Sequence, residues 1–196
     1  MSTPATVIFI GPQGSGKGTQ VELLAAAWQA DGRIVTCIQT GDVFRALGET
    51  DSYAAQAVAT CIEAGRLMPD AITNGLVVER LLKEMHAEND LIFDGYPRNQ
   101  AQLAVLQEVL EFFGRQQLDV VYLNTPDQIV QARMEARGRS DDTPASIAAR
   151  LQTYHQETAP LLARFTSAPN ITVHDISGAA TINEVHDSIL NALTAI

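Results

Sequence analysis

Short apolar runs rich in β-branched residues alternate along the chain with longer segments of helical periodicity. The runs predict five strands, at residues 6–10, 34–38, 90–93, 118–123 and 171–174. Strands that are apolar throughout, and separated by helices, are typical of a parallel sheet covered on both faces. The pattern therefore predicts a doubly wound α/β fold, in which a five-stranded parallel sheet is the middle of three α/β/α layers.

Apolar residues at helical spacing predict the faces that the intervening helices bury. These faces are Val21, Leu24 and Trp28, then Val78, Leu81, Leu82 and Met85, then Ile147, Leu151, Tyr154, Leu161 and Phe165. Asp70 after Pro69 and Thr143 before Pro144 predict helix starts at which the side-chain oxygen caps the helix. About fifty residues separate the second and third strands, far more than a simple crossover needs, so a helical insertion is expected there.

Composition and charge narrow the class of protein. The chain has 196 residues, of which 46% are hydrophobic, so one domain can bury a full core without a disulfide or a structural metal. Acidic residues outnumber basic ones by 23 to 13, and the net charge of −10 argues against nucleic-acid and anionic-membrane partners.

The cysteine count and the hydropathy indicate a compartment. Cys37 and Cys61 are too few and too widely spaced for a disulfide framework or a four-cysteine zinc site. No basic region precedes the first apolar run, and no stretch approaches the length of a membrane span. We therefore expect a protein of the reducing cytosol.

A glycine-rich segment, Gly11-Pro-Gln-Gly-Ser-Gly-Lys17-Gly-Thr19, follows the first predicted strand and opens the first helix. Its glycines let backbone N–H groups turn toward phosphate oxygens, the helix start adds the positive end of a dipole, and Lys17 adds a charge. In the general motif a serine or threonine follows the lysine, but here Gly18 stands there and Thr19 comes next. The segment predicts a nucleotide phosphate site, although Gly18 removes the usual magnesium ligand.

Charged residues elsewhere extend this site. Asp94 ends the third predicted strand, where a carboxylate beside nucleotide phosphates holds magnesium directly or through water. Arginines gather at 133, 137, 139 and 150. Arg133 and Arg137 lie four apart on one predicted helix, a repulsive spacing unless an anion lies between them. A solvated basic helix end, balanced by neighbouring acids, is the other interpretation of this cluster.

Five motifs follow one another along the chain: Gly11 to Thr19, Thr40-Gly-Asp-Val-Phe-Arg45, Asp94-Gly-Tyr-Pro-Arg98, Arg137-Gly-Arg-Ser-Asp-Asp142 and Tyr154-His-Gln-Glu-Thr-Ala-Pro160. They resemble the motifs of the adenylate kinases, a family of nucleoside monophosphate kinases. Each motif is shared with other phosphate-loop enzymes, but the five in this order are specific to this family and cover essentially the whole chain. The resemblance implies reversible Mg²⁺-dependent phosphoryl transfer, ATP + AMP = 2 ADP, by a monomer that needs no zinc.

The resemblance also implies a role for individual residues. The ATP-binding set is Gly14, Ser15, Gly16, Lys17, Gly18, Thr19, Arg133, Arg137 and the backbone of Ala180, with Asp94 acting on Mg²⁺ through water. The AMP-binding set is Thr40, Arg45, the backbone of Arg66, Leu67 and Met68, then Gly95, Tyr96, Pro97, Arg98, Gln102, Arg139 and Arg150. The catalytic set is Lys17, Arg98, Arg133, Arg137, Arg139 and Arg150. Lys17 and six arginines would then bring seven of the thirteen cations to one cleft.

By the same resemblance the chain is a single phosphate-loop kinase domain. Its core comprises residues 1–39, 70–137 and 143–196, with an AMP-binding insertion at about 40–69 and a very short lid at about 138–142. Longer members carry a β-rich lid, sometimes closed by four zinc ligands, for which this chain lacks both the length and the cysteines. Gln13 stands where many members have proline, and we expect it to loosen the loop slightly while activity survives.

Two other functions stay open from the residues. Arg98-Asn99-Gln100 resembles UMP/CMP kinases, but Thr40 and Gln102 argue against them, because the resembling pyrimidine branch tends to alanine and asparagine at these positions. The other alternative is a binding module that uses the phosphate loop as a nucleotide switch and transfers nothing. Such a module needs no second set of arginines for an acceptor phosphate.

Overall fold

The computed structural model describes residues 4–194, in which five strands form one parallel sheet. The strands are β1 (Thr6–Ile10), β2 (Val35–Gln39), β3 (Asp90–Asp94), β4 (Leu118–Asn124) and β5 (Ile171–Ser177), in the spatial order β2-β3-β1-β4-β5. Every pairing is parallel, so the predicted α/β fold is confirmed. Ile34 is exposed and lies just outside β2, although its carbonyl still accepts the N–H of Asp90. β5 runs to Ser177, three residues beyond the predicted end, because it pairs along the whole of β4.

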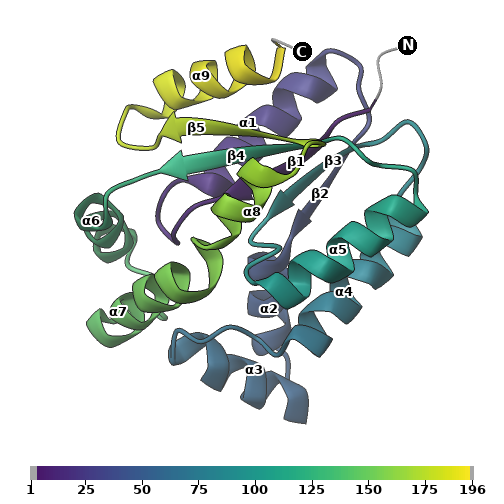
Figure 1. Cartoon of the computed structure of the whole chain (residues 1–196). Coiled ribbons are helices and arrows are strands. Elements are labelled where there is room, and N and C mark those ends of the chain that lie inside the picture. The colour runs from purple at the N-terminus through teal and green to yellow at the C-terminus, as the bar shows by residue number, and fades with distance from the viewer. Residues whose placement is uncertain (1–3, 195–196) are drawn as a thin grey trace.

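Helices cover both faces of the sheet (Figure 1). They are α1 (Lys17–Ala30), α2 (Thr40–Gly48), α3 (Tyr53–Glu63), α4 (Asp70–Glu84), α5 (Gln100–Phe112), α6 (Asp127–Arg137), α7 (Pro144–Thr153), the π-helical turn η1 (Tyr154–Thr158), α8 (Leu161–Ser167) and α9 (Ile182–Thr194). α1 and α9 pack against Val7 and Phe9 of β1, whereas α4, α5 and α8 pack against Ile8 and Ile10. β1 is therefore buried on both sides, as its apolar run predicts. None of these helices within residues 4–194 is long and apolar enough to cross a membrane.

The predicted buried face of α4 is confirmed at Leu81 and Met85 but not at Leu82. Its buried residues are Thr73, Val77 and Leu81, whereas Leu82 is 66% exposed. The sequence offers two overlapping apolar stripes here, and the packing of α4 against α5 and β2 buries the stripe that contains Val77 and Leu81. Periodicity alone does not distinguish the two stripes.

The two predicted helix caps have different outcomes. Thr143 caps α7 as predicted, in a reciprocal box with Ser146 and with Pro144 in the first turn. The predicted cap at Asp70 is wrong, because Pro69 occupies the N-cap position of α4 and no side chain caps the helix. The Asp70 carboxylate instead accepts hydrogen bonds from side chains at the start of α5.

Two groups of helices extend beyond the carboxyl ends of the strands (Figure 1). α2 and α3 pack on each other around a small apolar cluster of Phe44, Val58 and Met68, which is separate from the two cores on the sheet. α6 and α7 connect β4 to η1 and α8. Doubly wound sheets bind ligands where the strand order reverses, and here that point is the carboxyl end of β1, between β3 and β4.

Candidate functional site

The loop after β1 has the geometry of a phosphate cradle. Gly14 has a φ of 89°, and a Cβ there would lie 2.9 Å from both the Val130 carbonyl oxygen and Cγ of Met134, so only glycine fits. Gly16 is the N-cap of α1, with a φ of 102° and no side-chain cap. The first N–H groups of a helix have no partner within the helix, and an anion satisfies them well.

Lys17, the first residue of α1, is held over this loop. Its Nζ donates to the carbonyl oxygens of Gly11 at 2.7 Å and Pro12 at 2.8 Å. Desolvation lowers the pKa of Lys17 to about 8; Asp94 opposes this shift, while Arg98 and other nearby cations add to it. A phosphate in the loop offers the ammonium group a charged acceptor in place of two neutral carbonyls.

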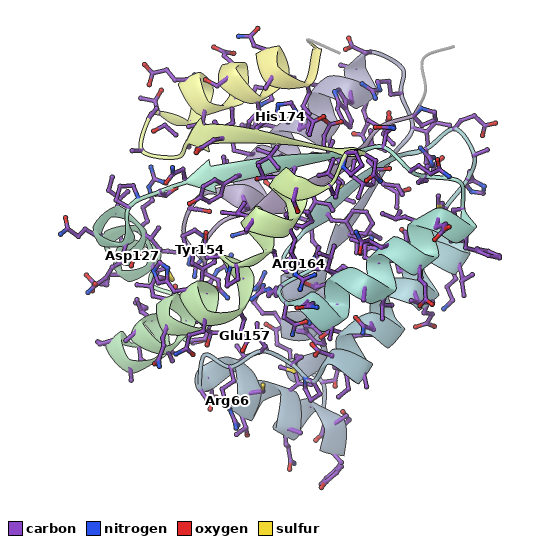
Figure 2. The ribbon with its side chains drawn as sticks, viewed as in Figure 1. Arg66, Asp127, Tyr154, Glu157, Arg164 and His174 are labelled. Carbon is purple, nitrogen blue, oxygen red and sulfur yellow. The ribbon has the colours of Figure 1, made fainter. Side chains whose placement is uncertain are left out.

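One cavity of about 500 Å³ opens from the phosphate loop. Residues of α2, the turn at 65–68, the end of β3, α6, α7 and the segment 178–182 complete its wall. Eight of the thirteen cations line it: Lys17, Arg45, Arg66, Arg98, Arg133, Arg137, Arg139 and Arg150. Arg66, which Figure 2 places beside α3, is the member of this set that the resemblance counts only for its backbone. A chain that is acidic as a whole thus presents one strongly basic cleft, which attracts anions.

Two aspartates fix arginines at this wall. The carboxylate of Asp142 has no exposed surface and accepts bonds of 2.8 and 2.9 Å from Arg137 and one of 2.8 Å from Arg150. Arg150 also pairs with Asp141 and donates to the carbonyl of Ile62 at 3.2 Å. Burial opposes ionisation of Asp142, but the hydrogen bonds and charges of both arginines hold its pKa below the ordinary value. The guanidinium groups are therefore positioned without a ligand.

Other arginines are crowded together. Burial lowers the pKa of Arg98; Asp94 opposes this shift, and the charges of Arg150 and Arg45 add to it. Burial is also the first cause of the lowered pKa of Arg139, and the charges of neighbouring arginines are the second. Guanidinium groups with too few carboxylates to balance them favour an anionic ligand, and their planar donors match phosphate oxygens.

The cavity has a neutral end, lined by Thr40, Phe44, Met68 and Gln102. The hydroxyl of Thr40 donates to the carbonyl of Gly95 at 2.9 Å, and a Cβ on Gly95, whose φ is 75°, would collide with that hydroxyl. The side chain of Gln102 is held by the backbone N–H of Arg98 and the carboxylate of Asp70. Apolar surface beside a fixed amide suits a heteroaromatic ring.

α6 joins the phosphate loop to the segment before α9. One nitrogen of Arg133 donates to the carbonyl of Gly178 at 2.8 Å and to that of Ser15 at 3.4 Å. A Cβ on Gly178 would overlap the Thr125 hydroxyl at 2.0 Å, so the close approach requires glycine. Ala180 lines the cavity from this segment.

Asp94 is the acidic side chain that ends β3 beside the phosphate loop. Its Oδ2 lies 3.6 Å from the position that a Cβ on Gly18 would take. Within the described residues, no group of three or more His, Cys, Asp and Glu side chains is placed to hold a metal by itself. Mg²⁺ in nucleotide sites is held by one or two carboxylates together with phosphates and waters. A single carboxylate here therefore fits a magnesium ion that is shared with a nucleotide.

The predicted site residues line the main cavity, with two exceptions. Tyr96 is completely buried, and its hydroxyl donates to Asn74 at 2.9 Å, so it supports the turn from beneath. Pro97 borders a smaller cavity next to the main one. The wall also contains uncharged residues that lie outside every motif, among them Gln39, Ile62, Thr73 and Ile182. Only the tertiary fold brings them to the wall.

The phosphate cradle, the second group of arginines and the neutral end beyond it define a phosphate-loop protein with two anion-binding ends in one cleft. The family model for adenylate kinase matches residues 9–169. The chain belongs to the adenylate kinase family.

Similarity to curated relatives extends over the length of the chain. The chain is 38% identical over 191 residues to the adenylate kinase of Bifidobacterium longum, which covers 95% of this chain and 98% of that protein. It is 35% identical over 188 residues to the adenylate kinase of Corynebacterium diphtheriae, with 95% and 98% covered. It is 38% identical over 156 residues to adenylate kinase 1 of a Nostoc species, with 80% and 82% covered.

Proposed function

We propose that this protein catalyses the reversible, Mg²⁺-dependent transfer of a phosphoryl group from ATP to AMP, which yields two molecules of ADP. The observation that best supports this proposal is a single cleft in which the phosphate loop faces a second, independent set of arginines. A nucleotide switch needs only the first set. Family membership supports the same reaction, and so do the names of the relatives.

We assign ATP to the phosphate-loop end of the cleft, and AMP to the second group of arginines together with the neutral end beside it. Lys17, Arg133 and Arg137 approach the ATP phosphates, with Gly14, Ser15, Gly16, Gly18, Thr19 and the backbone of Ala180 around them. AMP lies among Thr40, Arg45, Arg66, Leu67, Met68, Gly95, Arg98, Gln102, Arg139 and Arg150. Thr40 and Gln102, both buried at the neutral end, favour adenine over a pyrimidine.

The chemistry requires no general base. A phosphate monoester has a second pKa of about 6, so the acceptor oxygen is already a nucleophile at neutral pH. Transfer passes through a loose transition state, in which negative charge spreads over the γ-phosphate oxygens and Lys17, Arg98 and Arg137 stabilise it. Magnesium held by Asp94 and the nucleotide phosphates supplies further charge neutralisation when bound.

We propose that two segments close over the substrates. One is the insertion at 40–69, whose helices α2 and α3 have an apolar cluster of their own. The other is the short lid at 138–142, which carries the aspartates that hold Arg137 and Arg150. The remainder, 1–39, 70–137 and 143–196, is the core. Closure excludes water, which would otherwise compete with AMP as the acceptor.

We propose a monomer in the cytosol. Both parts of the site come from one chain, so no second copy is needed to complete it. Cys37 and Cys61 are both free thiols, which suits a reducing compartment. Sedimentation of the purified protein across a range of concentrations tests the monomer.

The experiment that tests the reaction is ADP formation from ATP with AMP, CMP, UMP, GMP and dTMP offered separately, with controls that lack an acceptor or lack Mg²⁺. Strong turnover with AMP alone is expected. Turnover with CMP or UMP instead would show that the acceptor base is a pyrimidine and not adenine, while the assigned phosphoryl transfer would stand. ADP formation without any acceptor would indicate an ATPase or a switch and overturn the two-substrate site.

A further inference from the structure

Gln102 lies at the neutral end of the cavity with both atoms of its side-chain amide engaged. Oε1 accepts the backbone N–H of Arg98 at 2.8 Å, and Nε2 donates to Oδ1 of Asp70 at 2.8 Å. A backbone N–H only donates and a carboxylate only accepts, so these partners determine which atom of the amide is oxygen. Gln102 is 1% exposed, and rotation of its amide by half a turn would break both bonds and set like groups against each other.

The Asp70 carboxylate is itself fixed. It belongs to the first turn of α4, and its Oδ1 also accepts a bond of 2.9 Å from the side chain of Asn99. Asn99 caps α5 by accepting the backbone N–H of Gln102 at 2.9 Å. The amide of Gln102, its carboxylate partner and the helix start that carries it therefore form one closed set of hydrogen bonds.

A fixed amide can distinguish the two kinds of purine. One acceptor position on Oε1 and one hydrogen on Nε2 remain free after the bonds to Arg98 and Asp70. A 6-aminopurine presents an amino donor beside an acceptor ring nitrogen, whereas a 6-oxopurine presents a carbonyl acceptor beside an N–H donor. A freely rotating amide can pair with either arrangement by turning over. A fixed amide pairs with only one.

We propose that Asp70 is a positioning residue for acceptor specificity, which fixes the Gln102 amide so that the site accepts a 6-aminopurine and rejects a 6-oxopurine. The inference rests on the proposed function, since it concerns the base of the acceptor nucleotide.

The test compares AMP with IMP, which differ in the base only at this edge, as acceptors for the wild type and for Asp70→Ala. We expect the ratio of kcat/KM for AMP to that for IMP to fall by about tenfold or more in the variant, because only the bond from the Arg98 N–H then opposes turning of the amide. The change should appear as a higher KM for AMP and a higher kcat/KM for IMP. KM for ATP should stay unchanged, since Asp70 does not line the cavity.

Two further variants separate positioning from a general structural effect. Asp70→Asn keeps an acceptor oxygen where Oδ1 stands, and should retain the wild-type AMP to IMP ratio. Asp127→Ala is the matched control, because Asp127 also begins a helix directly after a proline N-cap. Figure 2 places Asp127 on α6, well away from α4, so this variant loses a helix-start carboxylate without touching Gln102. Its ratio should not change.

An unchanged ratio in Asp70→Ala would overturn the inference, as would an equal loss of selectivity in Asp70→Asn. If Asp70→Ala does not fold, Asp70→Ser is measured in its place. Serine is well tolerated at helix starts but is too short to reach Gln102, so the AMP to IMP ratio of this variant then tests the inference. A wild type that phosphorylates neither AMP nor IMP would overturn the proposed function. A wild type that selects AMP, together with an equally selective Asp70→Ala, would overturn the role of Asp70 alone.

Discussion

At the scale of single residues, this site holds its charged groups in place before a ligand arrives. Carbonyl oxygens of the phosphate loop hold Lys17, and buried carboxylates hold Arg137 and Arg150. Charges that are fixed in advance need little reorganisation when the transition state forms, which is the main source of electrostatic catalysis. Because each of these side chains is held in place, replacing one of them should have its own measurable effect on catalysis.

Replacing Arg98 with alanine should reduce kcat by about 10² to 10³, because a fixed donor to the transferring or accepting phosphate is lost. Stability should hardly change, since the guanidinium group is crowded by Arg150 and Arg45 and its burial disfavours its charge. Turnover and thermal melting of the purified variant measure the two effects. Arg164→Ala, on α8 and outside the cavity (Figure 2), is the control and should behave as wild type. An unfolded Arg98→Ala protein would contradict this assignment.

The free protein should lose affinity for ATP at alkaline pH. The pKa of Lys17 is lowered to about 8, so the ammonium group is charged below that pH and loses its proton as the pH rises through it. We expect kcat/KM for ATP, which reports the free enzyme, to fall above about pH 8, while kcat falls only at higher pH because bound phosphate favours the ammonium form.

Lys17→Arg gives the control for this pH profile. A guanidinium group stays charged over the whole range, so this variant, even if slower, should show no decline near that pH. A wild-type kcat/KM that stays level well above pH 8 would show that Lys17 keeps its ordinary pKa.

At the scale of helices and strands, the sequence predicts most of what the fold contains. Apolar runs rich in β-branched residues identify all five strands. The central strands β1 and β3 are buried on both faces and show no polar alternation, whereas the edge strands β2 and β5 alternate in burial. The buried face of α4 is predicted only in part, because Leu81 and Leu82 are equally apolar and only packing against α5 distinguishes them. The hydrogen bonds of Asp70 could not be predicted for a related reason, since its partners at the start of α5 are about thirty residues away in the sequence.

The cap of α7 can be tested as an element. Thr143→Ala should lower the free energy of unfolding by about 1 kcal/mol, because the N–H of Ser146 loses its acceptor. Urea unfolding should show a lower midpoint at an unchanged m value. Thr166→Ala is the matched control, since that hydroxyl is exposed on α8 and bonds only to the preceding turn. Equal losses in both variants would show that the capping box contributes nothing.

At the scale of the whole molecule, charge is divided unevenly. The net charge is −10, yet eight of thirteen cations line one cavity. The motifs and the family resemblance identify seven of these eight, and their convergence follows from strand order, which no single motif contains. The acidic remainder of the surface repels polyanions that do not fit the cleft, so size and shape select the ligand as well as charge.

This division predicts a strong dependence of substrate binding on ionic strength. Raising KCl from about 0.1 M to about 1 M shortens the screening length from about 10 Å to about 3 Å, so attraction into the cleft weakens. KM should rise for both ATP and AMP, whereas kcat should change little because contacts inside the closed cleft are less screened. Initial rates at matched Mg²⁺ measure both constants. A fall in kcat with constant KM would place the effect on closure and not on binding.

The separate apolar cluster of Phe44, Val58 and Met68 makes the insertion a module that can diverge by itself. Its helices enter and leave the sheet through one connection, between β2 and β3, and the loop that holds the donor phosphates lies in another. Changes in the module can therefore alter which nucleotide is accepted while the transfer chemistry is inherited intact. A lineage that needs a new acceptor can obtain it by remodelling these roughly thirty residues together with Asp70 and Gln102 beside them, while the phosphate loop is kept.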